Sequence, residues 1–210
     1  LGSLLQELVL KMDTGDLFVY VQVTRGTGPR NHVFTEGCGN LWITLTPAGV
    51  LDGTVPLQLI TVEDTRFFHC NVKTLNLLPS VLASEKAKQA GCQEAIFYRP
   101  GGRVTECAHS NVHIIQDGML RTAPTDNLIL PGIARAHLIR MCKKLEIPVN
   151  ETPFTLDDLF SAEEVLVTSS SNFCLHADTI DGKTVGGRQP ELLERLRSAL
   201  VAEFYAATKN

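Results

Sequence analysis

The sequence has little that would indicate a metal cluster, a membrane span or a nucleic-acid partner. Its six cysteines are scattered and never form a C-x-x-C pair, which argues against a metal cluster or a disulfide framework. No apolar run approaches the roughly 18 residues of a membrane-spanning helix. The 19 basic and 23 acidic residues give a net charge of −4, and no basic patch stands out. We therefore expect neither nucleic acid nor a membrane as a partner.

The composition that remains is typical of a globular protein. Of the 210 residues, 44% are hydrophobic and 20% are charged, and this length permits one large domain or two small ones. The scattered cysteines fit reduced thiols in the cytoplasm. The chain has no initiator methionine and no signal peptide. It opens with Leu1, Leu4, Leu5 and Leu8 at helical spacing, so we expect a preceding segment that is missing from the sequence.

The order of the expected elements indicates an α+β fold. Hairpins and helices are mixed without the regular strand–helix alternation of a doubly wound sheet. Turns at Gly101-Gly102, Asp117-Gly118 and Asp181-Gly182 predict three hairpins. Helices are expected at the start of the chain and over Leu77 to Ala90, Ile133 to Leu145 and Glu191 to Tyr205, with a short one after an N-cap at Thr155; strands are expected over Leu17 to Thr24, Leu41 to Thr46, Leu57 to Glu63, Ala95 to Tyr98, Arg103 to Glu106, Val112 to Ile115, Met119 to Thr122 and Val165 to Thr168.

Lys73 differs from the other lysines in its apolar neighbourhood. Phe67 to Leu78 contains several apolar residues and no acidic one. Loss of hydration in such surroundings lowers the pKa of a lysine, and a neutral amine can form a Schiff base with a carbonyl. The alternative is a lysine whose charged end reaches water from a strand edge.

Glu106 follows a strand among Thr105, Cys107 and Ala108, where a carboxylate needs a cationic partner. A protonated pyridine nitrogen would be one such partner. An ordinary salt bridge to an arginine is the alternative.

Three further segments contain groups that bind anions. Pro131-Gly132-Ile133-Ala134 opens a helix, whose free amides can bind a phosphate, and Ser169, Ser170 and Ser171 could add hydroxyl groups. In the loop Arg25 to His32, Arg30 could hold a carboxylate through two parallel hydrogen bonds, with His32 on the same anion. Common turn chemistry and a solvated loop are the alternative interpretations.

Taken together, these segments resemble the fold-type IV pyridoxal-phosphate enzymes, and among them most closely the bacterial D-amino acid aminotransferases. The resemblance covers nearly the whole chain. The motifs are V-T-R-G-T-G-P-R-N-H (Val23 to His32), C-N-V-K-T-L-N-L-L (Cys70 to Leu78), V-T-E-x-x-x-S-N (Val104 to Asn111), N-L-I-L-P-G-I-A-R (Asn127 to Arg135) and V-T-S-S (Val167 to Ser170).

The resemblance implies a transaminase that exchanges amino and oxo groups between a D-amino acid, such as D-alanine, and a 2-oxo acid, such as 2-oxoglutarate. The cofactor would be pyridoxal 5'-phosphate. The catalytic Lys73 would hold it as a Schiff base, and Glu106 would hold its ring nitrogen protonated. Arg30 and His32 would bind the substrate carboxylate across a homodimer interface. The remaining cofactor contacts would be Leu130 against the ring, with Ile133, Ala134, Ser169 and Ser170 on the phosphate.

The chain also departs from this family. Ala134 stands where relatives often have threonine, Cys107-Ala108-His109 replaces a glycine-and-serine stretch, and Leu175-His176 replaces a threonine–proline pair. The family's small N-terminal domain is expected to be absent, which leaves residues 1–16 as its tail and connecting helix and 17–210 as the large cofactor-binding domain. An aminodeoxychorismate lyase, a branched-chain aminotransferase and a non-catalytic truncated relative are the alternatives.

Overall fold

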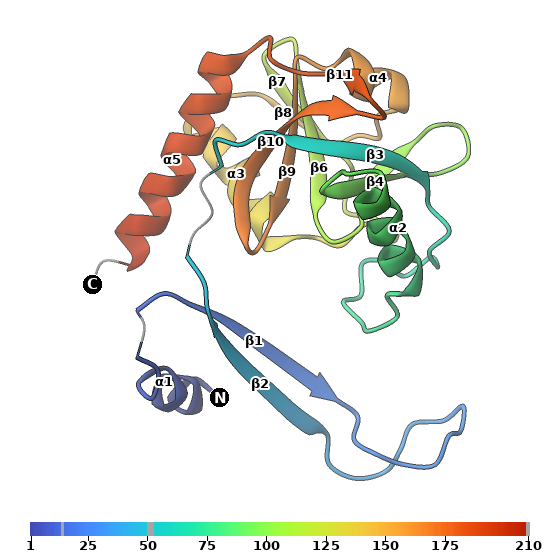
Figure 1. Cartoon of the computed structure of the whole chain (residues 1–210), viewed down its shortest axis with the longest axis vertical. Coiled ribbons are helices and arrows are strands. Elements are labelled where there is room, and N and C mark those ends of the chain that lie inside the picture. The colour runs from blue at the N-terminus through green and yellow to red at the C-terminus, as the bar shows by residue number, and fades with distance from the viewer. Residues whose placement is uncertain (14, 50–52, 209–210) are drawn as a thin grey trace. The chain divides into compact units, whose positions relative to one another are not determined.

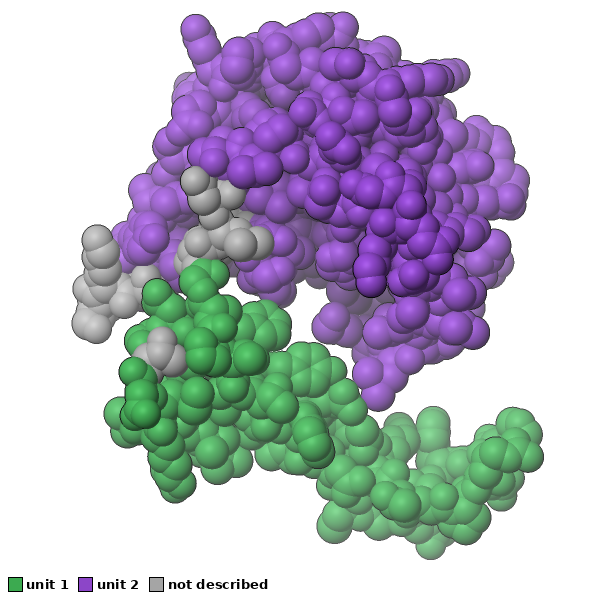
Figure 2. Space-filling model, in the orientation of Figure 1, with its two compact units in different colours: residues 1–51 green, residues 52–210 purple. Residues whose placement is uncertain are grey.

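A computed structural model describes residues 1–13, 15–49 and 53–208 (Figure 1). The chain divides into two compact units, residues 1–51 and 52–210 (Figure 2). The expected domain boundary between residues 16 and 17 stays a prediction.

Unit 1 is a helix followed by a long hairpin. It consists of α1 (Gly2–Val9), β1 (Leu17–Thr24) and β2 (Asn40–Pro47). The two strands are antiparallel, with Leu17 opposite Pro47 and Thr24 opposite Asn40. The expected helix and both expected strands are therefore confirmed. The intervening segment, residues 25–39, contains no helix or strand.

Unit 2 is built on one mixed sheet. Its order in the described residues is β5-β4-β3-β10-β9-β6-β7-β8, and β11 pairs with β10. The pairs β3–β4, β3–β10 and β7–β8 are parallel, whereas the others are antiparallel. This mixture, combined with the helices, confirms the α+β expectation. The strands are β3 (Leu57–Glu63), β4 (Glu94–Tyr98), β5 (Val104–Cys107), β6 (Asn111–Gln116), β7 (Met119–Thr122), β8 (Val149–Asn150), β9 (Glu164–Ser169), β10 (Asn172–Ile180) and β11 (Lys183–Thr184).

Helices pack on this sheet through three apolar clusters. Ala83 and Ala87 of α2 (Leu78–Gln89) pack with Phe97 of β4. Helices α3 (Ile133–Lys144) and α5 (Pro190–Thr208) share a second cluster with the sheet, and α4 (Leu156–Ser161) contributes to the third. Thr155 caps α4 as expected, because its hydroxyl accepts from the Asp158 amide. None of the helices in the described ranges has the length and apolar character to cross a membrane.

A buried histidine connects three strands of the sheet. His113 of β6 is fully buried, and its ring nitrogens lie 2.8 Å from Thr122 Oγ1 on β7 and 2.9 Å from Thr168 Oγ1 on β9. Burial lowers the pKa of His113 to about 3, and the nearby charge of Arg135 acts in the same direction. The imidazole is therefore neutral at physiological pH and serves as a structural hydrogen-bonding group.

Candidate active site

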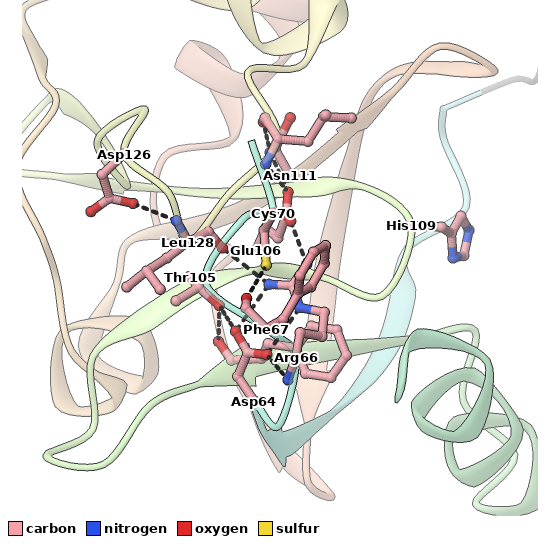
Figure 3. A network of polar contacts seen from close by, with 12 residues as sticks. Asp64, Arg66, Phe67, Cys70, Thr105, Glu106, His109, Asn111, Asp126 and Leu128 are labelled. Carbon is pink, nitrogen blue, oxygen red and sulfur yellow. Dashed lines mark hydrogen bonds and ion pairs between the residues drawn. The ribbon is translucent and has the colours of Figure 1, made fainter. Parts of the chain in front are cut away.

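The site is organised around the carboxylate of Glu106. The hairpin of β4 and β5, which turns at Gly101 and Gly102 with φ of +85° and +79°, places this residue inside unit 2 at 5% exposure. Arg66 Nη1 donates to Glu106 Oε1 at 2.5 Å. Asn111 Nδ2 donates to Oε2 at 3.0 Å (Figure 3). The Leu130 amide donates to the same oxygen at 3.0 Å. Three donors from three segments thus converge on one buried carboxylate.

Asn111 connects Glu106 to the loop that precedes α3. Its Nδ2 atom also donates to the carbonyl oxygen of Leu130 at 3.0 Å. A Cβ atom at Gly132 would lie 2.1 Å from Asn111 Oδ1, so glycine is what permits this close approach. The backbone of Asn111 also pairs with that of Thr168 where β6 and β9 run side by side, and Thr168 directly precedes Ser169. Asn111 thus connects the carboxylate and the loop before α3 through its side chain, and the end of β9 through its backbone.

Two groups of anion-binding type lie in this region. Gly132 is the N-cap of α3 and has no side chain with which to cap the helix, and the amides of Ile133 and Ala134, in the first turn, have no partner within the helix. Ser169 and Ser171 flank the turn after β9, with their hydroxyl oxygens 3.1 Å apart. The structure therefore connects Glu106 with Leu130 and with the loop that leads to Ile133 and Ala134, and it places Ser169 next to the residue that pairs with Asn111. The roles of these residues toward a cofactor stay a prediction.

The turn between β5 and β6 is held by a second buried carboxylate. Glu94 lies 2.8 Å from His109 Nδ1, and it accepts from Ser110 Oγ at 2.8 Å. The hydrogen bond to Glu94 raises the pKa of His109. This contact fixes the turn that separates Glu106 from Asn111, at the place where the sequence departs from the glycine-and-serine stretch expected of relatives.

Lys73 does not lie where its apolar neighbours predicted. The expectation that this neighbourhood removes the lysine from water is wrong for the single chain, because Lys73 is exposed there. The reason is that residues 64–77 form neither helix nor strand, and their apolar side chains also face solvent: Val72 is 54% exposed and Leu75 63%.

The segment that contains Lys73 is nevertheless anchored to the Glu106 region. The Cys70 amide donates to Asn127 O at 2.9 Å, and Asn127 Nδ2 donates to Phe68 O at 3.0 Å. Arg66, in the same segment, donates to the carbonyl oxygen of Leu128 at 3.1 Å. The backbone that leads to Lys73 therefore runs along the loop that ends at Leu130.

Arg30 and His32 lie in unit 1, on the exposed segment between β1 and β2. Arg25 in the same segment stacks on Phe34, with its guanidinium carbon 3.6 Å from the ring centroid. Within the described residues, Arg30 makes no ion pair, so its guanidinium is available to an anion. The structure does not place these two residues relative to Glu106, and their role stays a prediction.

Sequence reasoning missed Arg66. Of the alternatives for Glu106, the structure shows the salt bridge to an arginine. Burial raises the pKa of Glu106 to about 7, whereas Arg66 and the Leu130 amide lower it. Burial lowers the pKa of Arg66, but the hydrogen bonds and charges of Asp64 and Glu106 together raise it above its ordinary value. The available signal was Asp64-Thr65-Arg66, a charged cluster directly after a predicted strand.

The residues present fit pyridoxal phosphate. That cofactor has an anionic phosphate at one end and a basic ring nitrogen on the other side of its ring. The uncapped start of α3 and the serine hydroxyls suit the phosphate, and the buried Glu106 carboxylate suits a protonated nitrogen. Asn111 links the two groups, because its amide donates both to Glu106 and to the loop before α3.

Comparison with known proteins gives the same assignment. The chain matches the family described as amino-transferase class IV over residues 1–180. It is 40% identical to a D-alanine aminotransferase of Listeria monocytogenes serotype 4b, across 99% of this chain and 74% of that protein. A Legionella pneumophila structure, provisionally described as a 4-amino-4-deoxychorismate lyase, aligns with a TM-score of 0.81 at 22% identity, over 94% of this chain and 75% of that one.

A third similar protein was solved with the amine form of the cofactor. A branched-chain amino acid aminotransferase from T.th., solved with pyridoxamine 5'-phosphate, aligns with a TM-score of 0.72 at 26% identity, over 79% of this chain and 58% of that one. The resemblance inferred from the sequence motifs is thereby confirmed at the level of the family. The chain belongs to the class IV aminotransferases and is a pyridoxal phosphate-dependent aminotransferase.

Proposed function

We propose that the protein transfers an amino group between a D-amino acid, such as D-alanine, and a 2-oxo acid, such as 2-oxoglutarate. The observation behind this proposal is the 40% identity to a D-alanine aminotransferase over 99% of the chain. Arg30, which has no ion-pair partner among the described residues, and the nearby His32 support it, because a guanidinium in that loop can bind a substrate carboxylate by two parallel hydrogen bonds.

Each residue has a distinct proposed task. When bound, pyridoxal phosphate supplies an aldehyde that bonds to amines and a ring that accepts an electron pair. Lys73 offers the amine that holds this aldehyde carbon and then moves the proton at the α-carbon of the substrate. Glu106 accepts a hydrogen bond from the ring nitrogen and keeps it protonated. Leu130 packs on the ring, while the remaining contacts hold the phosphate: Ile133, Ala134, Ser169 and Ser170.

Arg30 and His32 are proposed to orient the substrate. By holding its α-carboxylate, they would fix which face of the α-carbon meets Lys73. Such orientation contributes to the rate, because the reacting atoms no longer have to find each other by diffusion.

We also propose a homodimer in the cytoplasm. Support for the dimer comes from apolar side chains of α2 and the segment before it, including Leu78 and Val81, which are 66% and 58% exposed. All six cysteines are free, which fits a reducing compartment. Sedimentation velocity on the loaded protein tests the dimer, and a monomer at micromolar concentration would contradict it.

The activity is tested by mixing the loaded protein with D-alanine and 2-oxoglutarate and measuring pyruvate. We expect pyruvate formation to require both substrates and to be lost in Lys73→Ala. Lys86→Ala, which removes an exposed lysine from α2, serves as the matched control and keeps full turnover. Borohydride treatment followed by mass spectrometry should fix the cofactor to Lys73.

The same assay separates the alternatives. Pyruvate released from aminodeoxychorismate without an amino acceptor would indicate the lyase, and preference for L-leucine over D-alanine would indicate a branched-chain aminotransferase. Either result would overturn the proposed substrate class while leaving the family unchanged.

A further inference from the structure

Arg66 uses both sides of its guanidinium to join two carboxylates. Its Nε and Nη2 atoms donate to the two oxygens of Asp64, each at 2.9 Å, and Nη1 donates to Glu106 Oε1 at 2.5 Å (Figure 3). The Arg66 side chain is 10% exposed, and that of Asp64 is fully buried. A planar guanidinium can make this double contact, whereas a lysine ammonium cannot reproduce its fork geometry.

The position of Arg66 is fixed from several directions. Asp64 Oδ2 accepts from Thr105 Oγ1 at 3.0 Å and lies 3.2 Å from Arg99 Nε. The Arg66 guanidinium carbon lies 4.5 Å from the centroid of the Phe97 ring. Arg66 therefore reaches Glu106 from a support that does not depend on Glu106 itself.

The hydrogen bonds on Glu106 leave one acceptor position. An ionised carboxylate has about four acceptor positions, two on each oxygen. Oε2 accepts from both Asn111 Nδ2 and the Leu130 amide. Oε1 accepts from Arg66, and among the described residues it has no second donor. The open position therefore lies on the oxygen that Arg66 holds.

Arg66 also supplies the positive charge that offsets the effect of burial on the Glu106 carboxylate. A buried carboxylate with no cation becomes a neutral acid, which donates its proton instead of accepting one. Within the described part of the chain, Arg66 is the cation in contact with Glu106.

We infer that Arg66 is a positioning residue that keeps Glu106 ionised and offers the free position on its Oε1 atom to the ring nitrogen of the cofactor. This inference rests on the proposed function of Glu106. Asp64 acts through Arg66, because its two oxygens set the direction of the guanidinium. The protonation state of the ring nitrogen therefore depends on Arg66, which acts on the cofactor through Glu106.

The test uses Arg66→Gln and, as a matched control, Arg121→Gln. Arg121 pairs with Asp158 at 2.8 Å and is partly buried, with a side-chain exposure of 20% against 10% for Arg66, and Glu106 is not among its partners in the described residues. The proteins are loaded with pyridoxal phosphate that carries ¹⁵N in the ring, and the nitrogen chemical shift is recorded at pH 7.5. We expect a protonated ring nitrogen in the wild type and in Arg121→Gln, and an unprotonated one in Arg66→Gln.

A second measurement does not require the cofactor. The carboxyl group of Glu106 is titrated by ¹³C NMR in cofactor-free protein labelled at the glutamate carboxyl carbon, with Glu106→Gln used to assign the signal. Removing Arg66 should raise the measured pKa of Glu106 by roughly 1 to 3. Arg66→Lys keeps a charge but not the fork, so it should give an intermediate value, and it replaces Arg66→Gln if that variant does not fold.

The outcomes separate the two proposals. A ring nitrogen that stays protonated in Arg66→Gln, or an unchanged pKa of Glu106, would overturn the role of Arg66. Wild-type protein that binds no cofactor would instead overturn the proposed function, and the carboxyl titration would still decide whether Arg66 controls the charge of Glu106.

Discussion

Gly132 lies so close to Asn111 that a methyl group at position 132 would come within 2.1 Å of Asn111 Oδ1. Asn111 Nδ2 is engaged by Glu106 Oε2 and by the carbonyl oxygen of Leu130, each at 3.0 Å. The missing side chain at position 132 is therefore what lets one asparagine serve both the carboxylate and the loop before α3.

Gly132→Ala should destabilise unit 2 by about 1–3 kcal/mol, as overpacking of a filled interior does. The backbone itself permits alanine, because Gly132 has φ −65° and ψ 139°. Urea unfolding measures the loss. Gly49→Ala is the control, since a Cβ there meets no atom within 4 Å. In an Asn111→Ala background the change should cost much less, and an equal cost would show that the collision is not the cause.

Glu106→Gln should lower the free energy of unfolding by about 1–3 kcal/mol in cofactor-free protein. A carboxamide has one acceptor oxygen, whereas Arg66, Asn111 and the Leu130 amide all donate to this side chain. At least one donor is then left facing the amide nitrogen. Glu63→Gln, an exposed position at the end of β3, is the control. Equal stability of Glu106→Gln and the wild type would refute the donor arrangement.

Acid should weaken unit 2 through His113. Its pKa is about 3 in the folded chain against 6.5 in the unfolded chain, so acid favours the unfolded state. The contribution is fully present above pH 6.5 and is lost as the pH falls toward 3. The slope is about 1.4 kcal/mol per pH unit. Urea unfolding of His113→Gln, which does not titrate there, should show a shallower dependence between about pH 6 and 4. Parallel curves would mean that the imidazole is not held neutral.

Arg30→Ala should raise the KM for D-alanine about tenfold or more, because one charge-assisted pair of hydrogen bonds to the carboxylate is lost. The affinity for pyridoxal phosphate should stay within about twofold, which separates substrate binding from cofactor binding. Steady-state kinetics and cofactor titration provide the two values. Arg25→Ala removes the same charge from the same loop, and a matching rise in KM there would argue for general electrostatic attraction over a carboxylate site at Arg30.

Periodicity and turn residues predicted most of the elements of this fold, because those signals are local. The hairpin at Gly101-Gly102 and the N-cap at Thr155 are examples, and both depend on neighbouring residues alone. The parallel pairing of β3 with β10 joins residues more than a hundred positions apart, and no local pattern reports it. The short strand β8 was also missed, since two residues carry no periodicity.

The site was predicted by type of residue more than by contact. Glu106 and the start of α3 were identified, whereas the 40-residue separation between Arg66 and Glu106 concealed their ion pair. The exposure of Lys73 shows the opposite error. Apolar neighbours in sequence do not bury a side chain unless the fold brings other segments over it, and in this chain they lie on a surface segment.

The place of β10 bears on how the chain is made. This strand lies between β3 and β9, yet it is among the last strands to be synthesised. Until residue 180 leaves the ribosome, β10 cannot pair with β3 on one side and β9 on the other. The edges of β3 and β9 are then left open to pairing with other chains. We therefore expect nascent chains that end before residue 180 to be more prone to aggregation through these edges than the complete chain.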